Sequence, residues 1–445
     1  MTEIKDKHIT ILGAVRSGIA AAILAKKMGA IPFVSDYSSE LSAVPELDEN
    51  SISYELGGHS DKVYNCDFII TSPGVPTNSV VIVNAIAKGI KIFSEIEFAS
   101  WFCKGNIIAI TGSNGKTTTA SLCAHTLNKC GINTYLAGNI GLAFSEIVLD
   151  VKEDDFVTLE VSSFQLDFID SFKPKYAVIL NITPDHLDRY DNNFEQYASS
   201  KLGINRNQDD EDFIIVNSDD SVLSKSKFEN GIRIEFGFNK VEKGVHKVDD
   251  QFVYNKLDTT ENICSTDILK IRGEHNQYNA MAVICISKML GLENDLVAEA
   301  LSSFDGVEHR LEFVRNINGI DFINDSKATN VDSVRFALNS FSNPIRLILG
   351  GKDKGNDYNQ IEDLVIKNVV KIYAIGSSAE KIVNYFNSKV DVEKVDSFEN
   401  AITNAYNESK NGDIVLLSPA CASFDMFKNY EERGKNFKNM VMNLK

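Results

Sequence analysis

The sequence predicts an α/β protein with mainly parallel sheets. Strand-like and helix-like segments alternate along almost the whole chain, which is the pattern of parallel strands joined by helical crossovers. At 445 residues the chain has the length of about three domains of ~150 residues each. A hydrophobic fraction of 43% is enough for sizeable cores, and a charged fraction of 24% is ordinary for a soluble protein.

Composition argues against several classes of function. The formal net charge of −17 disfavours a nucleic-acid surface, because binding to a phosphate backbone depends on clustered Lys and Arg. The seven cysteines are scattered without a C-x-x-C pair, which argues against a disulfide framework or a structural zinc site and fits a reducing cytoplasm. No apolar run approaches the ~20 residues that span a bilayer. We therefore expect a soluble, cytoplasmic protein with no stable membrane association.

The chain opens with three strand-like segments separated by helix-like stretches, at residues 8–12, 31–36 and 67–72. The turn "GAVRSG", from Gly13 to Gly18, follows the first, and Asp36 ends the second, where dinucleotide-binding folds place a ribose-binding acid. This predicts a Rossmann-like N-terminal domain. The spacing is G-x-x-x-x-G rather than G-x-G-x-x-G, so a hydride-transfer cofactor is weakly indicated and a turn that binds nothing stays an alternative. A second turn, at 71–76, could line the same crevice.

A phosphate-binding loop is predicted within "IIAITGSNGKTTTA", residues 107–120, where a strand, a glycine turn and a helix follow one another. Two residues separate Gly112 from Gly115, whereas four separate the glycines of G-x-x-x-x-G-K-[ST]. Backbone N–H groups of such a turn bind phosphate oxygens. Lys116 would neutralise the β/γ-phosphates, and the Thr117 hydroxyl would reach Mg²⁺. The alternative is an exposed Asn-Gly turn with an ordinary surface lysine.

Polar side chains follow two further strands of this central segment. Glu160 ends the strand "DFVTLE", and Asp185 and His186 come just after another strand, in "LNITPDHLDRY". Imidazole there could be a metal ligand or a catalytic base. Taken singly, the glutamate could begin a helix and the histidine could lie on the surface. At the ends of successive strands beside a phosphate loop, they converge on the crevice where α/β sheets bind ligands.

The pattern changes between residues 231 and 273 to short alternating stretches, which we interpret as antiparallel strands appended to the central sheet. Four strand-like segments then alternate with helices and predict a Rossmann-like C-terminal domain, at residues 319–325, 345–351, 371–376 and 413–419. The central segment is predicted to be a P-loop-type ATPase domain with a mainly parallel sheet and a small antiparallel part. The predicted domain bounds are 1–98, 99–306 and 307–445.

Eight motifs resemble the Mur ligases in order and spacing, and together they cover essentially the whole chain: "TGSNGKTTT", "GNIG", "LEVSSFQLD", "NITPDHLDRY", "GEHNQYNAMAV", "EHRLEF", "NDSKATN" and "LSPACASFDMFKNYEERG". Within this family the chain looks like the branch that adds D-glutamate. The phosphate loop is shared with folylpolyglutamate synthases, so it is specific only to the superfamily. The motifs "NDSKATN" and "SPACASFD" are far more specific, and the DNPR-type motif of the ligase that adds a diamino acid is absent from the sequence.

The resemblance implies an ATP-dependent amide ligase that joins D-glutamate to UDP-N-acetylmuramoyl-L-alanine through an acyl phosphate, in cytoplasmic peptidoglycan precursor synthesis. It implies three domains, which bind the UDP-substrate, ATP and the amino acid in turn. It further implies two Mg²⁺ ions as cofactors, and we expect a monomer. A ligase similar to folylpolyglutamate synthase is the nearest alternative, although that enzyme lacks the N-terminal UDP-binding domain.

The resemblance also assigns residues. It gives catalytic roles to Lys116, His186 and Lys201, the last matching a lysine that CO₂ carbamylates. The implied metal ligands are Thr117, Glu160, His186 and Lys201. The implied ATP-binding residues are Gly112, Ser113, Asn114, Gly115, Lys116, Thr117, Thr118, Asn276, Asn279, Arg310 and Asp325. The implied UDP-substrate residues are Arg16, Asp36, Ser72, Gly74 and Asn139, and those for D-glutamate are Lys327, Thr329, Lys354, Ser423 and Tyr430.

Two of these positions depart from the family pattern, since Arg16 is bulkier than the expected small or apolar residue and Tyr430 replaces an expected Phe. Read alone, Lys201 would be a surface lysine on a helix. Two rival classes also stay open. A P-loop switch or motor would hydrolyse ATP without an amine acceptor, and a nicotinamide-dependent oxidoreductase would bind that cofactor at the N-terminal turn.

Overall fold

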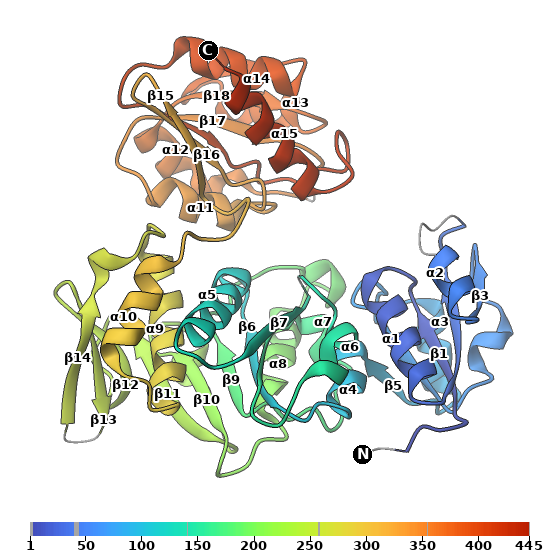
Figure 1. The fold of residues 1–445 in the computed structure, drawn as a ribbon. Helices are drawn as coiled ribbons and strands as arrows, with labels where there is room; N and C mark the ends of the chain where they lie inside the picture. The colour runs from blue at the N-terminus through green and yellow to red at the C-terminus, as the bar shows by residue number, and fades with distance from the viewer. Residues whose placement is uncertain (1–2, 40–43, 140, 257–258, 354, 445) are drawn as a thin grey trace. The chain divides into compact units, whose positions relative to one another are not determined.

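A computed structural model describes residues 3–39, 44–139, 141–256, 259–353 and 355–444. It has three α/β parts, each built on its own sheet, as the sequence predicts (Figure 1). Contacts divide the chain into two compact units. Unit 1 comprises Met1–Ile268 and Tyr278–Ser303, and unit 2 comprises Leu269–Gln277 and Phe304–Lys445. The predicted boundary at residue 98 falls inside unit 1, so the three domain bounds stay predictions.

The first part of unit 1 is a five-stranded, fully parallel sheet in the order β3-β2-β1-β4-β5. Its elements are β1 (His8–Leu12), α1 (Arg16–Lys27), β2 (Ile31–Asp36), α2 (Val44–Glu49), β3 (Ser53–Leu56), η1 (Asp61–Tyr64), β4 (Phe68–Thr71), α3 (Val80–Ala87), β5 (Ile92–Ser94) and α4 (Glu95–Ser100). Because β1 lies between β2 and β4, the turns after these three strands meet at the point where strand order reverses, and ligands bind there in open α/β sheets.

The second part of unit 1 is a nine-stranded sheet in the order β14-β13-β12-β11-β10-β9-β6-β8-β7. Its strands are β6 (Asn106–Thr111), β7 (Thr134–Gly138), β8 (Phe156–Glu160), β9 (Tyr176–Ile179), β10 (Phe213–Asn217), β11 (Ile232–Gly237), β12 (Lys243–Val248), β13 (Gln251–Lys256) and β14 (Thr259–Ser265). Its helices are α5 (Lys116–Lys129), α6 (Phe144–Ile147), η2 (Val148–Asp150), α7 (Ser163–Leu166), η3 (Leu187–Arg189), α8 (Phe194–Leu202), η4 (Gly203–Asn205), η5 (Leu223–Lys225), η6 (Thr266–Ile268), α9 (Glu274–Met289) and α10 (Asn294–Ser303).

The prediction of antiparallel strands between residues 231 and 273 is wrong for β11. This strand pairs parallel with both β10 and β12, and the antiparallel pairs of the described segment are β12–β13 and β13–β14. The connection from β10 to β11 passes through η5 and returns the chain to the same end of the sheet, which gives parallel pairing. Alternating hydrophobicity indicates a strand but not the direction of its partner.

Unit 2 contains a six-stranded sheet in the order β15-β16-β20-β17-β18-β19, parallel except for the β15–β16 pair. Its elements are β15 (Glu312–Ile317), β16 (Ile320–Asn324), α11 (Val331–Asn339), β17 (Ile345–Gly350), η7 (Tyr358–Ile361), α12 (Glu362–Asn368), β18 (Val369–Ile375), α13 (Ala379–Phe386), β19 (Asp391–Lys394), α14 (Phe398–Glu408), β20 (Ile414–Leu417) and α15 (Tyr430–Asn443). Residues of α11, α12 and α13 form one apolar core, and residues of α14 and α15 form another.

Helix α9 is divided between the two units. Its first turn belongs to unit 2 together with the preceding residues from Leu269 on, and the rest belongs to unit 1. Inside unit 2, the His275 ring lies 5.4 Å from the Phe336 ring of α11, and Lys270 pairs with Asp305 at 2.6 Å. Burial lowers the pKa of His275 to about 4, so the ring is neutral at physiological pH.

One buried carboxylate joins the two parts of unit 1. Glu97 of α4 accepts hydrogen bonds from the indole N–H of Trp101 at 2.7 Å and from the backbone N–H groups of Asp170 and Phe172 at 2.9 and 2.7 Å. The backbone N–H and hydroxyl of Ser171 donate to it as well, at 3.0 and 2.6 Å. A single apolar core also extends from β1 through α4 and α6 to β10. These contacts explain why both sheets belong to one compact unit.

Candidate active site

The predicted phosphate loop lies at the reversal point of the nine-stranded sheet. Strand β6 lies between β8 and β9, and the loop follows its last residue, Thr111. Gly115 begins α5 with a φ of 85°, and a Cβ there would lie 2.6 Å from Oδ1 of Asn279, so glycine is required both by its backbone and by its neighbour. The strand, turn and helix that the sequence predicts are therefore confirmed, and the N-terminus of α5 lies where an anion would be stabilised.

The loop is held by hydrogen bonds from the segment that follows β9. Asn181 accepts from the backbone N–H of Asn114 at 2.8 Å and donates to its carbonyl at 3.0 Å. The Ser113 hydroxyl donates to the Thr183 carbonyl at 2.7 Å and lies 2.9 Å from the Tyr197 hydroxyl. These contacts pre-form the loop, which reduces the ordering cost of binding a phosphate chain.

Thr117 and Glu160 meet as the sequence predicts. The Thr117 hydroxyl donates to one carboxylate oxygen of Glu160 at 2.8 Å, and the amide of Asn139 donates to the other at 3.1 Å. Glu160 is almost fully buried at the end of β8. A hydroxyl and a carboxylate at the start of α5 are oxygen ligands of the type that Mg²⁺ prefers.

His186 lies in a left-handed conformation, with φ 50° and ψ 31°, immediately before η3. Its Nε2 is 3.7 Å from a carboxylate oxygen of Asp185, and its ring meets the Phe164 ring edge to face, with centroids 5.4 Å apart. About half of the side chain is exposed. The imidazole is thus accessible to a ligand while a carboxylate and an aromatic ring orient it.

Lys201 lies under the phosphate loop rather than on the surface, so its interpretation as a surface lysine is wrong. Its side chain is 2% exposed, and its Nζ donates to the carbonyl of Gly112 at 2.9 Å. The Nζ of Lys116 donates to the same carbonyl at 2.6 Å. Burial, together with the Lys116 charge, lowers the pKa of Lys201 well below its usual range. The structure therefore brings to the phosphate loop a buried amine that loses its proton more easily than an exposed lysine does.

A cavity of about 840 Å³ opens at the reversal point of the first sheet. It is lined by the predicted UDP-substrate residues Arg16, Asp36, Ser72, Gly74 and Asn139, together with Tyr37, His59, Pro73, Val75, Gln165 and others. Asp36 also accepts the backbone N–H of Ala14 at 2.6 Å and thereby fixes the glycine turn. The Arg16 guanidinium donates to the Asn139 carbonyl at 3.3 Å. The two turns predicted to share a crevice do so.

In unit 2, the predicted residues gather around the segment after β16. Lys327 donates its backbone N–H to the His309 carbonyl at 3.1 Å, and its Nζ lies 5.5 Å from the centre of the Tyr430 ring. The buried Arg433 donates to the hydroxyl and the carbonyl of Ser326 at 3.0 and 2.7 Å and to the Cys421 carbonyl at 3.1 Å. Arg433 thereby ties the Lys327 segment to the loop that carries Ser423. Of the remaining predicted residues, Thr329 and the buried Ser423 are described, and Lys354 lies outside the described residues.

Two further predicted nucleotide residues fall in different units. Asn276, in unit 2, donates its side-chain amide to the Arg272 carbonyl at 2.7 Å, whereas Asn279, in unit 1, adjoins Gly115. Arg310, also in unit 2, has a buried Nε that makes no hydrogen bond among the described residues. Their predicted role in binding the nucleotide stays a prediction.

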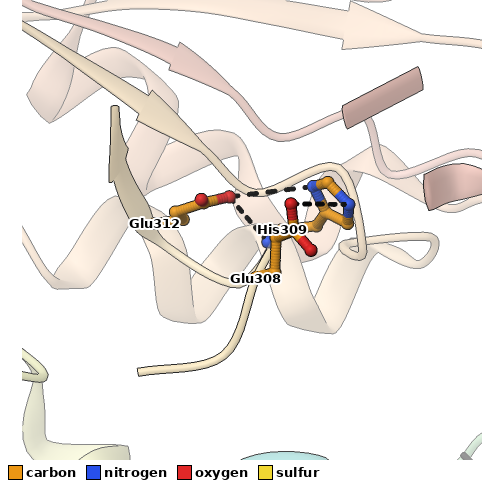
Figure 2. Close-up of side chains that lie close together, drawn as sticks. All are labelled: Glu308, His309 and Glu312. Carbon is orange, nitrogen blue, oxygen red and sulfur yellow. Dashed lines mark hydrogen bonds and ion pairs between the residues drawn. The ribbon is translucent and has the colours of Figure 1, made fainter. Parts of the chain in front are cut away.

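Glu308, His309 and Glu312 have ligand atoms within 4.8 Å of one another, which is the spacing of a metal site. Figure 2 shows each ring nitrogen of His309 facing one of the two carboxylates. The Asn324 amide nitrogen lies 2.9 Å from Nδ1 and, as a donor, completes the contacts of the ring on that side. Lys438 already pairs with both glutamates, at 2.9 Å from Glu308. We therefore assign these side chains to an ion-pair cluster that holds α15 rather than to a metal centre.

Asp325 makes unit 2 sensitive to pH. Burial raises the pKa of Asp325 to about 6, which outweighs the opposing effects of the Arg310 charge and of hydrogen bonds from Ser418 and Leu311. Between about pH 4 and pH 6 the unfolded chain loses this proton before the folded chain does, so the free energy of unfolding falls as the pH rises. We expect this fall in denaturant titrations of the wild type, on the order of 3 kcal/mol, and its absence in Asp325→Asn. Parallel pH profiles in the two proteins would contradict it.

Sequence reasoning missed three residues that shape the site. Arg189 lies within the motif "NITPDHLDRY", and Tyr197 lies a few residues after it. However, Arg189 bonds to Pro73 and Val75, and Tyr197 bonds to Ser113, which are distant in sequence. His59, which lines the cavity, belongs to no motif.

Within the described parts of the chain, every helix is too short or too polar to cross a bilayer.

Together, the fold and the phosphate loop define a nucleotide-binding α/β enzyme. The chain matches the Mur ligase middle domain over residues 110–287, the Mur ligase glutamate ligase domain over 309–421 and the MurD N-terminal domain over 12–81. It is 43% identical to a UDP-N-acetylmuramoylalanine--D-glutamate ligase of Salinibacter ruber, with 99% of each chain covered. The chain belongs to the Mur ligase family, whose members use ATP.

Solved structures show the same fold at low sequence identity. The UDP-N-acetylmuramate-alanine ligase MurC of Thermotoga maritima superposes with a TM-score of 0.63 at 20% identity, covering 99% of this chain and 100% of that one. The E. coli FolC protein, solved with DHPP and ADP, superposes with a TM-score of 0.58 at 16% identity, covering 77% of this chain and 91% of that one. At these identities the likeness shows the fold alone.

Proposed function

We propose that this chain joins D-glutamate to UDP-N-acetylmuramoyl-L-alanine at the expense of ATP. The observation that carries the proposal is full-length identity of 43% to a relative named for this reaction. The arrangement of unit 1 supports it. Asn139 lines the large cavity of the first sheet and also bonds to Glu160, which bonds to Thr117 of the phosphate loop. An acceptor bound in the cavity would therefore end next to the nucleotide.

The reaction needs activation because a carboxylate is a poor electrophile. A carboxylate oxygen of the acceptor attacks the γ-phosphorus of ATP, and ADP leaves, which gives an acyl phosphate. The amine of D-glutamate then attacks the carbonyl carbon, phosphate leaves with the C–O bond electrons, and the nitrogen loses a proton to give the amide. Lys116 and the backbone N–H groups at the start of α5 would stabilise the negative charge that moves during the first step.

Two Mg²⁺ ions are part of the proposal, and the residues fit them. Thr117 and Glu160 would hold one ion, and His186 and Lys201 would hold the other. When bound, Mg²⁺ would supply positive charge that stabilises the negative charge of the phosphate groups. The buried Thr117–Glu160 pair offers hard oxygen ligands, and the half-exposed His186 offers a nitrogen.

Lys201 fits this role only as a carbamate. An ammonium would repel a cation, whereas a carbamate ends in two oxygens. Burial lowers the pKa of the Lys201 amine, and once deprotonated its lone pair would attack CO₂, forming an N–C bond and releasing a proton. The Gly112 carbonyl, 2.9 Å from Nζ, orients this nitrogen under the loop.

Unit 2 would supply the amino-acid and part of the nucleotide contacts. We propose that Lys327, Thr329, Lys354, Ser423 and Tyr430 bind D-glutamate, and that Arg310 and Asp325 contact ATP. Asn276 of unit 2 and Asn279 of unit 1 would lie around the adenine. Lys327 beside the Tyr430 ring supports a site for a carboxylate, since a charge-assisted contact recognises that group well. We further propose that the enzyme acts in the cytoplasm as a monomer and binds no nucleic acid.

Phosphate release from ATP tests the proposal directly. We expect release only when UDP-N-acetylmuramoyl-L-alanine and D-glutamate are both present, with L-glutamate at least about a hundredfold less effective in kcat/KM. That ratio corresponds to about 2.7 kcal/mol of discrimination. A pteroate acceptor with L-glutamate is the matched control for the folylpolyglutamate synthase alternative. Turnover with that pair, or hydrolysis without any acceptor, would refute the proposed function.

A further inference from the structure

Arg189 connects two segments of unit 1 that are more than a hundred residues apart in sequence. It ends η3, three residues after His186. Its Nη2 donates to the backbone carbonyls of Pro73 and Val75, at 3.3 and 3.1 Å. Both of these residues line the 840 Å³ cavity. One side chain of the His186 turn therefore supports a wall of the substrate cavity.

The other side of the Arg189 guanidinium packs on an aromatic ring. Its central carbon lies 4.2 Å from the centre of the Phe164 ring. That same ring contacts His186 edge to face at 5.4 Å and stacks on Tyr190 at 5.9 Å. The Tyr190 hydroxyl donates to the Asp167 carboxylate at 2.9 Å. The guanidinium is thus fixed by the same ring that orients His186.

The cavity wall that Arg189 supports is a short turn with few other anchors among the described residues. The backbone N–H of Val75 donates to the Ser72 carbonyl at 3.0 Å, and the Ser72 hydroxyl donates to the Gly13 carbonyl at 3.2 Å. Two carbonyls of this turn, on either side of Gly74, accept from one guanidinium. Both bonds come from the Nη2 group, while the planar face of the same guanidinium packs on the Phe164 ring, and a lysine ammonium has no such face.

We propose that Arg189 is a positioning residue for the UDP-substrate, which holds the turn from Ser72 to Val75 in its binding shape and at a fixed place relative to the His186 turn. The proposal rests on the proposed function of the cavity. Without Arg189 the turn would have to be ordered by the substrate itself, and that ordering lowers affinity. Because ATP binds at the phosphate loop and not at this turn, its affinity should be spared.

Arg189→Gln tests this, with Arg206→Gln as a matched control. Arg206 also lies in the central part of unit 1 and donates to backbone carbonyls, those of Leu166, Ile169 and Gly203, but to none that lines the cavity. We expect Arg189→Gln to raise the Kd of UDP-N-acetylmuramoyl-L-alanine about tenfold in calorimetry, with the KM for ATP changed less than twofold. Arg206→Gln should lower the Tm about as much as Arg189→Gln does. Its Kd for UDP-N-acetylmuramoyl-L-alanine should stay within twofold of the wild-type value.

Arg189→Lys is the second variant, because it keeps a cation and N–H donors for the turn but lacks the planar group that packs on Phe164. It should fold even if Arg189→Gln does not, and its Kd for the UDP-substrate should fall between those of the wild type and Arg189→Gln. An unchanged Kd in either folded variant would overturn the proposal, as would equal losses for the UDP-substrate and ATP. Ligation of D-glutamate by the wild type is measured in parallel. If the wild type ligates and the variants bind the UDP-substrate with unchanged Kd, the positioning role of Arg189 fails while the proposed function stands.

Discussion

Lys201→Ala should lose nearly all ligation and still bind ATP. We expect kcat to fall by about a thousandfold, which corresponds to about 4 kcal/mol of transition-state stabilisation. The reason is that the variant lacks the nitrogen, held under the Gly112 carbonyl, that we propose takes up CO₂ and so supplies two oxygens at the phosphate loop. Phosphate release measures the loss, and titration with a fluorescent ATP analogue measures the retained binding.

Small carboxylates provide the sharper readout for this variant. Added formate or acetate should partly restore turnover in Lys201→Ala, because each supplies two oxygens to the space left by the side chain. Lys225→Ala, which removes an exposed lysine elsewhere in unit 1, is the control and should be unaffected by either anion. Full activity of Lys201→Ala under CO₂-free conditions would exclude the carbamate.

Glu97→Ala should have the largest effect on stability. It leaves the indole N–H of Trp101 and the donors of Asp170, Ser171 and Phe172 without their acceptor. Each buried donor left unsatisfied costs about 1–3 kcal/mol, and we expect about 4 kcal/mol in total after relaxation. The Tm of unit 1 should fall by about 8–12 °C in differential scanning calorimetry.

Glu97→Gln and Glu146→Ala separate the causes of this loss. Glutamine keeps one acceptor oxygen, so its Tm should lie between those of the wild type and the alanine variant. Glu146 is an exposed carboxylate on the neighbouring α6, and its removal should change the Tm by less than about 1 °C. If the two alanine variants melt at the same temperature, Glu97 is not the connection that its contacts indicate.

Local pattern accounts for much of the fold. The strands β1, β2, β4, β6, β8, β17, β18 and β20 coincide with apolar runs in the sequence, and the glycine turns after β1 and β6 lie at the reversal points of their sheets. The direction of β11 could not be read in the same way, because pairing depends on where the connection from β10 leads. The short strands β3 and β5 were missed since three or four residues do not establish a period.

In the site, as in the fold, features set by local sequence could be predicted and features set by tertiary packing could not. The phosphate loop and Glu160 could be predicted because their functional side chains lie next to one another in sequence, or at the last residue of a strand. The burial of Lys201 could not, because it results from how α8 packs under a loop almost ninety residues earlier. The contacts of Arg189 and Glu97 could not be predicted either, since many of them are made with backbone groups of distant residues, which any sequence would offer.

The division of α9 has a consequence for synthesis on the ribosome. The residues of unit 1 end at Ser303, so that unit can complete its contacts before the rest of unit 2 has been made. The segment Leu269–Gln277 emerges earlier than its partners, and His275 has no Phe336 ring to pack against until α11 has left the exit tunnel. Until then the segment Leu269–Gln277, which includes only the first turn of α9, lacks its partners from the rest of unit 2. Unit 1 is therefore expected to complete its own contacts during synthesis before this segment can do so.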